Sequence, residues 1–172
     1  VVATGHTSTD QAETVLFRLA RGTGRTGALG MVPVTGDVVR PLLCVPADEV
    51  RAWCADRGLA VVEDPSNRDR RYARARVRGG LLPALEQVHP GAGMAVARFA
   101  EQLRDEAEVL DVMVDAAWRR CCQGDGLTAA ALAAEHPALA RLAVRRLAAA
   151  AGVGLDALWV ARCVELAHAN GG

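Results

Sequence analysis

Three side chains with chemical potential lie in the stretch GHTSTDQAET, residues 5–14. On a helix, Asp10 and Glu13 would project from neighbouring positions, where two carboxylates can together hold a cation or an amine. His6 precedes them in a loop, where an imidazole can contact a phosphate. The same residues also fit a structural interpretation, in which Asp10 caps the helix, Glu13 closes a capping box and His6 is an ordinary loop residue. Spacing alone leaves both interpretations open.

A second cluster is the run RDRRYARARVR, which places six arginines within residues 68–78. On a helix, Arg71, Arg74 and Arg78 would share one face. Each guanidinium offers a rigid fork of donors that suits phosphate, so the run favours contact with an anion or a nucleic acid. The alternative is a solvated charged surface, although no acidic residue is interleaved after Asp69.

Other candidate residues give weaker signals. Arg21 begins the glycine-rich segment RGTGRTGALGM, which does not match a dinucleotide-binding fingerprint and is predicted to be a loop. Arg40, in RPLL, fits either the rim of a cleft or the edge of a strand. The five cysteines form no CxxC pair and are expected to be free thiols, and His89, His136 and His168 are too scattered for a metal site.

The first cluster requires a strand, a loop and a helix to position it. Residues 1–4 are predicted to be a short buried strand, and residues 10–20 an amphipathic helix capped by Ser8, Thr9 or Asp10. A second apolar run follows at residues 37–46, and then a helix from Pro46 to Gly58 with Val50, Trp53 and Cys54 facing inward. LAVVED, residues 59–64, is predicted to be the next strand. This alternation predicts an α/β fold with part of a parallel sheet.

The character of the chain changes near Gly91. Before it, residues 68–90 are predicted to be helical with a restart at Pro83. After it, apolar residues at near-heptad spacing predict one long helix over about residues 93–122, and residues 127–170 predict two or three more helices. We therefore expect an α/β domain at residues 1–90 and an all-α domain at residues 91–172.

Composition excludes some functions and leaves others open. The 172 residues carry 20 basic and 20 acidic groups, so net charge predicts neither nucleic-acid nor membrane binding. All basic residues are arginine, which excludes a Walker-type phosphate loop because that loop needs a lysine. Neither an export signal nor a long apolar span is present in this sequence, so no membrane partner is expected.

Taken in order, GHTSTDQAETVLFRLARGTG, RPLL, EDPSN and YARARVRGGLLPAL resemble the tRNA(Ile)-lysidine synthetase family, a branch of the PP-loop ATP pyrophosphatases. The likeness spans about residues 1–90 and is weaker beyond. It implies a partial Rossmann-like parallel sheet followed by a helical domain, and a cytoplasmic enzyme that uses ATP and Mg²⁺. That enzyme adenylates the wobble cytidine of the isoleucine tRNA with a CAU anticodon, and free L-lysine then attacks the activated carbon. The resemblance leaves room for a homodimer.

The resemblance also implies roles for individual residues. Gly5 and His6 match the family's Gly-His at the ATP site, and Asp10 and Glu13 match its Asp-Gln-x-Glu-Thr motif. These acids would hold the lysine ammonium or organise the nucleotide and metal. Arg74, Arg76 and Arg78 match the family's basic run, so the catalytic set expected from the resemblance is His6, Asp10, Glu13, Arg76 and Arg78. Phosphate contacts that position tRNA are expected from Arg21, Arg40, Arg71, Arg74 and Arg78.

The sequence departs from the family pattern at three places. Thr9 stands where the family often has Asp, and Ala75 where it often has Asn. The SGGxDS loop that wraps the pyrophosphate precedes the Gly-His motif in the family and is absent here, so the chain is expected to be a fragment that is inactive by itself. Two alternatives remain: another PP-loop tRNA-modifying enzyme, which the lack of paired cysteines disfavours if it uses iron–sulfur chemistry, and a non-catalytic RNA-binding or helical interaction module.

Overall fold

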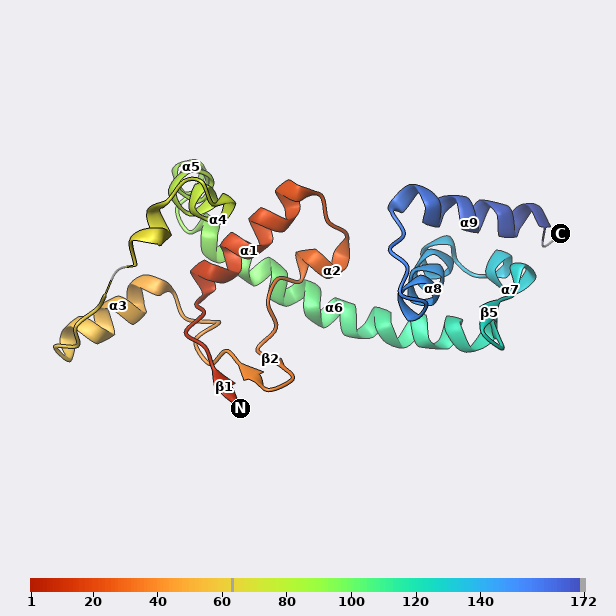
Figure 1. Cartoon of the computed structure of the whole chain (residues 1–172), viewed down its shortest axis with the longest axis horizontal. Coiled ribbons are helices and arrows are strands. Elements are labelled where there is room, and N and C mark those ends of the chain that lie inside the picture. The colour runs from red at the N-terminus through yellow and green to blue at the C-terminus, as the bar shows by residue number, and fades with distance from the viewer. Residues whose placement is uncertain (63, 171–172) are drawn as a thin grey trace. The chain divides into compact units, whose positions relative to one another are not determined.

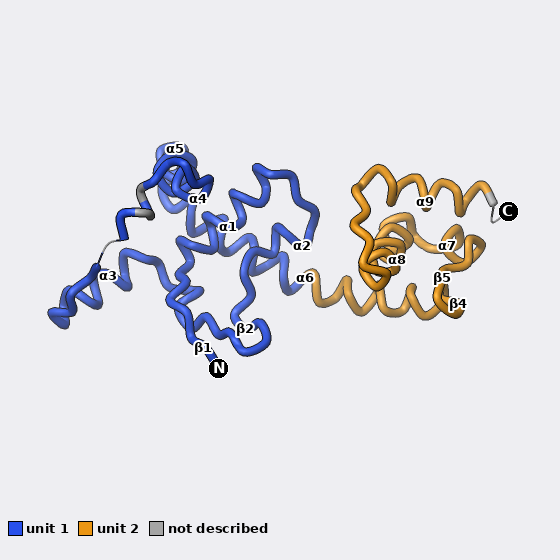
Figure 2. The backbone as a smooth tube through the Cα atoms, in the orientation of Figure 1, with its two compact units in different colours: residues 1–105 blue, residues 106–172 orange. Residues whose placement is uncertain are grey.

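The computed structural model describes residues 1–62 and 64–170, which form two compact units, residues 1–105 and residues 106–172 (Figures 1 and 2). In chain order the elements of the first unit are β1 (Val2–Ala3), α1 (Ser8–Arg21), α2 (Arg25–Ala28), β2 (Val34–Thr35), β3 (Val38–Val39), α3 (Ala47–Asp56), the 3₁₀ helix η1 (Pro65–Arg68), α4 (Ala73–Arg76), the π-helical turn η2 (Val77–Leu81), α5 (Leu82–Val88) and the start of α6 (Ala92–Cys121). The second unit contains the rest of α6, β4 (Cys122–Gln123), β5 (Gly126–Leu127), α7 (Ala129–Ala134), α8 (Pro137–Ala150) and α9 (Ala157–Asn170).

The sheet of the first unit is small, and it confirms the α/β class while showing the parallel sheet only in part. Its strand order is β1-β3-β2, with β1 parallel to β3 and β2 antiparallel to β3. The parallel pair joins Val2 to Val38 and Ala3 to Val39. The strand predicted at the start of the chain is thus confirmed, with the apolar run near residue 38 as its partner, but the burial predicted for it is wrong, because Val1 and Val2 are 95% and 58% exposed.

The strand predicted at residues 59–64 is wrong over the residues that the structure describes. Residues 59–62 and 64 are not in a strand, and Leu59, Val61 and Val62 are exposed, Val62 to 91%. Residue 63 of that prediction, which is also the first residue of the EDPSN motif, lies outside the described residues. An apolar run forms a strand only where a neighbour completes its hydrogen bonds, and this run pairs with no described strand.

The helix predicted after Pro46 is confirmed as α3, but the inward position predicted for Trp53 is wrong. No residue of α3 is buried, and Trp53 is 52% exposed. The guanidinium of Arg57 lies 4.0 Å from the centre of the Trp53 ring and covers it in a cation–π contact. The aromatic ring therefore packs against the residue that follows α3 rather than into a core, and it stays half-exposed.

One close backbone approach fixes the loop that follows α2. The Gln11 side-chain amide donates to the carbonyl of Met31 (2.9 Å) and accepts from its N–H (2.7 Å). Gly30, beside it, has φ +67°, and a Cβ there would lie 2.6 Å from Gln11 Oε1. Only glycine fits this position, because both the backbone conformation and the space exclude a side chain.

The long helix predicted over about residues 93–122 is confirmed as α6, and three further helices follow it. The structure adds the short β4–β5 hairpin, which the sequence did not predict. The two compact units divide at residue 105, within α6, so the domain boundary expected near residue 91 stays a prediction.

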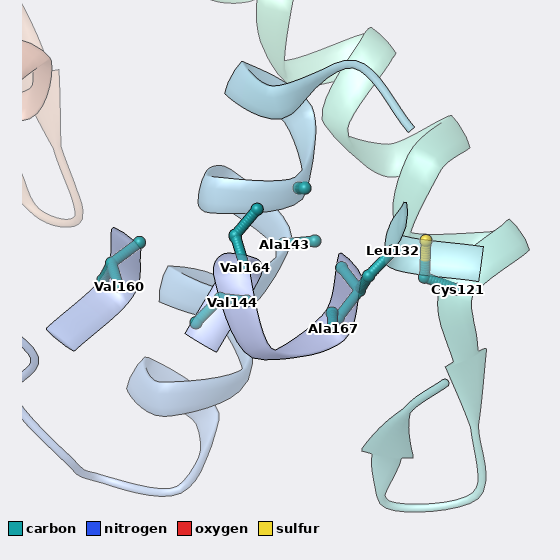
Figure 3. Packing of buried hydrophobic residues seen from close by; sticks show 8 residues of the cluster. Cys121, Leu132, Ala143, Val144, Val160, Val164 and Ala167 are labelled. Carbon is teal, nitrogen blue, oxygen red and sulfur yellow. The ribbon is translucent and has the colours of Figure 1, made fainter. Parts of the chain in front are cut away.

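Small residues dominate the core of the second unit (Figure 3). Ala140 and Ala143 of α8 have no exposed surface, and they pack in a cluster with Val160 and Val164 of α9. The same cluster includes Leu132 and Cys121, which Figure 3 also labels. Because alanine side chains are short, this cluster can fill its interior only if the helices that carry it pack closely.

None of the helices in the described parts of the chain combines the length and apolar composition needed to cross a membrane.

Candidate active site

The N-terminus of α1 is built by Thr7, which was not among the predicted caps. Thr7 adopts an extended conformation (φ −110°, ψ 174°), and its hydroxyl accepts a hydrogen bond from the Asp10 N–H. Asp10 Oδ2 in turn accepts from the Thr7 N–H and the Thr7 hydroxyl, each at 2.8 Å. The structure therefore has a capping box that begins three residues earlier than the one weighed from the sequence, with Thr7 and Asp10 in place of Asp10 and Glu13.

Thr9 and Thr14, on either side of Asp10 along α1, also make structural hydrogen bonds. Thr9 Oγ1 accepts from the N–H of Ala47, the first residue of α3, at 3.2 Å. Thr14 Oγ1 donates to the carbonyl of Asp10 at 2.8 Å. The threonine that replaces the family's aspartate at position 9 thus serves as an acceptor for a helix N-terminus, a task that needs no negative charge.

Asp10 and Glu13 meet Arg74 and Arg78 in a network that we call the quartet. Glu13 accepts from Arg74 Nε (3.1 Å), Arg78 Nε (2.5 Å) and the Arg78 terminal nitrogen NH2 (3.0 Å). Asp10 Oδ1 accepts from NH2 of Arg74 (2.8 Å) and NH2 of Arg78 (3.0 Å). Two carboxylates thereby neutralise two guanidinium groups that lie more than 60 residues away in the sequence.

Burial differs sharply within the quartet. The Glu13 side chain has no exposed surface and that of Asp10 is 18% exposed, whereas those of Arg74 and Arg78 are 47% and 37% exposed. Burial alone would raise the pKa of Asp10, but hydrogen bonds from Thr7 and the charges of Arg74 and Arg78 outweigh it and hold that pKa below its ordinary value. The hydrogen bond to Glu13 raises the pKa of Arg78. Both shifts favour the charged forms, the carboxylate of Asp10 and the guanidinium of Arg78.

Beside the quartet is an open cavity of about 640 Å³, which we call the active-site pocket. It is lined by Gly5, His6, Asp10, Asn67, Tyr72, Arg74, Ala75 and Arg78. His6 Nδ1 is hydrogen-bonded to Thr4 Oγ1 at 2.9 Å, which leaves Nε2 as the ring nitrogen that can meet a ligand. The end of β1, the first turn of α1 and the arginine segment thus converge on one cavity.

The structure brings together one part of the predicted site. Gly5, His6, Asp10, Arg74 and Arg78 line the active-site pocket, with Glu13 behind them in the quartet. The remaining predicted residues do not line it. They are Arg21, Arg40, Arg71 and Arg76.

Two of these arginines, Arg76 and Arg71, instead make contacts around the turn that precedes α4. Arg76 donates to the carbonyls of Arg70 and Arg71, each at 2.9 Å, and so holds the turn ahead of α4. Arg71 lies in that turn, paired with Asp69 at 2.7 Å, so the shared helical face predicted for Arg71, Arg74 and Arg78 is wrong for Arg71. The helix begins only at Ala73 because Asp69 binds the Arg71 N–H and stabilises a turn.

Arg21 lines a shallow hollow together with Arg76, and Arg40 lines a separate cavity. Sequence reasoning also missed residues of the active-site pocket itself. Tyr72 and Asn67 line it, and the signal was available because both lie in the motifs EDPSN and YARARVR.

No group of three or more His, Cys, Asp and Glu side chains that could hold a metal ion occurs among the residues that the structure describes. In the quartet, the oxygens that a metal would need are already occupied by guanidinium donors. The carboxylates as they stand here therefore do not fit a direct metal site.

The chain is similar in sequence to known proteins over most of its length. The PP-loop domain family matches residues 1–85. The chain is 44% identical over 158 residues to the tRNA(Ile)-lysidine synthase of Leifsonia xyli, which covers 88% of this chain and 48% of that protein. It is 43% identical over 159 residues to the enzyme of the same name from Thermobifida fusca, covering 91% of this chain and 49% of that protein.

A third relative gives a shorter match of similar identity. The tRNA(Ile)-lysidine synthase of Geobacter sulfurreducens is 45% identical over 121 residues, which cover 69% of this chain and 26% of that protein. The chain thus spans about half the length, or less, of these curated relatives. Together with the PP-loop match, these identities show that the chain belongs to the tRNA(Ile)-lysidine synthetase family of PP-loop proteins.

Proposed function

We propose that this chain forms part of the active site of a tRNA(Ile)-lysidine synthetase. The cytidine carbonyl oxygen attacks the α-phosphorus of ATP and pyrophosphate leaves; the amine of free lysine then attacks the activated carbon and AMP leaves. The observation that carries the proposal is the quartet at the edge of the active-site pocket, because it unites the first and the last of the four motifs on which the family resemblance rests.

The pocket is suited to an anion such as the phosphates of ATP. Arg74 and Arg78 bind the carboxylates through Nε and NH2. Their NH1 groups make no hydrogen bond within the quartet and can donate toward the cavity that both residues line. His6 contributes Nε2, and Gly5 presents backbone with no Cβ to obstruct a ligand. Fixed donors of this kind stabilise the negative charge that builds as pyrophosphate leaves.

The two acids take different roles in this proposal. Glu13 has no exposed surface and its oxygens receive three guanidinium hydrogen bonds, so it holds the arginines in place and does not itself reach a ligand. Asp10 borders the pocket and keeps some exposed surface, so it is the carboxylate within reach of a lysine ammonium. The attacking amine must lose its proton, and a carboxylate at the pocket edge can orient it for that transfer.

Magnesium and tRNA complete the proposed reaction. Because the quartet does not offer free metal ligands, Mg²⁺ would reach the site on the triphosphate of ATP. The tRNA(Ile) with its CAU anticodon would present the wobble cytidine to the pocket. Arg21, Arg40 and Arg71, which are not drawn into the quartet, remain the proposed phosphate contacts for this tRNA.

The resemblance to the family is the only support for a homodimer and for a cytoplasmic location. The same resemblance suggested a catalytic role for Arg76. Because Arg76 holds the turn that precedes Arg74, we propose that it acts on catalysis through the placement of that segment. A homodimer is checked by light scattering of the purified protein, where the mass of one chain would contradict it.

The test is lysine incorporation by the full-length protein. Labelled L-lysine, ATP and Mg²⁺ are supplied with tRNA(Ile) carrying CAU or, as a control, UAU at the anticodon. We expect ATP-dependent labelling of the CAU transcript only. Absence of labelling with a folded protein, or equal labelling of both transcripts, contradicts the proposed function.

A further inference from the structure

The first unit contains a second cavity, of about 660 Å³, whose charged residues are mostly basic. Arg40, Arg98 and Arg104 line it, with Glu101 as the acidic member and Leu43 and Met94 among its apolar residues. We call it the arginine cavity. Its residues come from the loop after β3 and from the first turns of α6, and Ser8 and Gln11 of α1 also border it.

These arginines differ from those of the active-site pocket in having no carboxylate partner. In residues 1–62 and 64–170, Arg40, Arg98 and Arg104 form no ion pair, although Glu101 lies on the same helix as two of them. Arg74 and Arg78, by contrast, are neutralised by Asp10 and Glu13. Of the two cavities, the arginine cavity therefore has the larger excess of positive over negative side chains.

Two of the arginines are held in place by backbone groups. Arg40 NH1 donates to the Val32 carbonyl (2.8 Å) and to Thr35 Oγ1 (3.1 Å), and Arg104 NH1 donates to the carbonyls of Leu29 (3.1 Å) and Met31 (3.2 Å). The loop between α2 and β2 thus fixes both guanidinium groups through NH1, and the other nitrogens of each have no acceptor among the described residues. A guanidinium group that is already held in place loses little side-chain conformational entropy when it binds a planar or tetrahedral anion.

Arg40 also carries an unusual unsatisfied donor. Its Nε is buried and has no hydrogen-bond partner in the structure. A buried donor on a cation is costly unless an acceptor satisfies it, and an anion bound beside the Arg40 guanidinium would offset part of that cost. Arg98, exposed at the rim, is free to meet the same ligand from α6.

We infer that the arginine cavity binds a phosphate group of the RNA backbone next to the reacting nucleotide. Both cavities border the first turns of α1, the active-site pocket through Asp10 and the arginine cavity through Ser8 and Gln11, so one RNA strand can contact both. The apolar residues Leu43 and Met94 can receive the sugar or base attached to that phosphate. This inference rests on the proposed function, since it takes tRNA as the substrate.

The test compares Arg98→Gln with Arg119→Gln in the full-length protein. Both arginines are exposed on α6 and lack an ion pair among the described residues, but Arg119 lies outside the cavity. We expect Arg98→Gln to weaken tRNA(Ile) binding about three- to tenfold and to reduce the slope of log affinity against log salt by about 0.7–0.9, and Arg119→Gln to change neither. Arg98→Lys, which keeps the charge, should restore most of the slope.

ATP binding measured without tRNA distinguishes an RNA phosphate from a free one. We expect Arg98→Gln to leave ATP affinity unchanged; weakened ATP binding with an unchanged RNA slope would assign the cavity to a free phosphate and overturn the inference. Equal tRNA binding by the Arg98 and Arg119 variants would also overturn it, while normal lysine incorporation in that case leaves the proposed function standing. If the unsubstituted protein binds no tRNA(Ile), the proposed function fails and this inference with it.

Discussion

Replacement of Glu13 by glutamine should release the arginine segment from α1. Glu13 accepts three guanidinium hydrogen bonds, at 3.1, 2.5 and 3.0 Å, and is fully buried. Glutamine keeps one carbonyl acceptor but turns the other oxygen into an NH2 group that faces guanidinium donors. A lost hydrogen bond to a charged group costs about 1.5–3 kcal/mol, and hydration of the half-exposed arginines recovers part of it, so we expect a local loss of about 2 kcal/mol.

Hydrogen–deuterium exchange of the chain measures this loss where it occurs. A local opening that becomes about 2 kcal/mol easier speeds exchange about 30-fold, and we expect this for amides of residues 73–81. Glu135→Gln is the matched control, because Glu135 forms a similar two-point pair with Arg120 in the second unit, at 2.5 and 3.0 Å. Unchanged exchange at residues 73–81 in Glu13→Gln, or an equal increase throughout both units, would refute the role of Glu13 as a local anchor.

Three further substitutions test the neighbourhood of α1. Because the pKa of Asp10 lies below its ordinary value of 3.8, its ionised form stabilises the fold above about pH 4 and that stabilisation is lost as the pH falls through the folded-state pKa; Asp10→Asn should therefore flatten the acid limb of the free energy of unfolding measured by urea titration. Gly30→Ala should lower the melting temperature more than Gly36→Ala does, since both glycines have positive φ (+67° and +54°) but only at Gly30 would the Cβ meet another residue. Thr7→Val should cost about 1 kcal/mol of stability in the same urea titration, and Thr7→Ser should recover it because serine also caps a helix; equal loss in both variants would contradict the capping role.

Local patterns in the sequence predicted helices α1 and α6, because a helix depends on residues that lie close together in the sequence. The periodicity of α1 is confirmed by Ala12 and Val15, which have no exposed surface, and the near-heptad spacing of α6 is confirmed by a helix of 30 residues. The identity of the cap was wrong, since Thr7, Ser8, Thr9 and Asp10 all have side chains that can cap a helix and only the path of the chain before α1 decides among them.

The interactions that define the site could not be predicted in the same way. The pairing of Glu13 with Arg74 and Arg78 joins residues 61 and 65 positions apart, and nothing in the local spacing of either motif indicates it. The arginine run was predicted to face an anion because no acidic residue is interleaved after Asp69, yet its acidic partners come from α1. Charge in a sequence motif therefore predicted that a polar site exists but not which charges remain free to bind a ligand.

The alanine-rich core of the second unit has a consequence for the gene. An alanine codon is a single nucleotide change away from codons for glycine, proline, valine, threonine, serine and either aspartate or glutamate. At the fully buried Ala140 and Ala143, glycine and proline weaken helix α8, valine and threonine overfill the contact with α9, and an acid buries a charge. Few of the amino-acid replacements that one nucleotide change can produce at these codons are therefore neutral for stability, and a library of random variants should show depletion of such replacements there as strong as at the quartet.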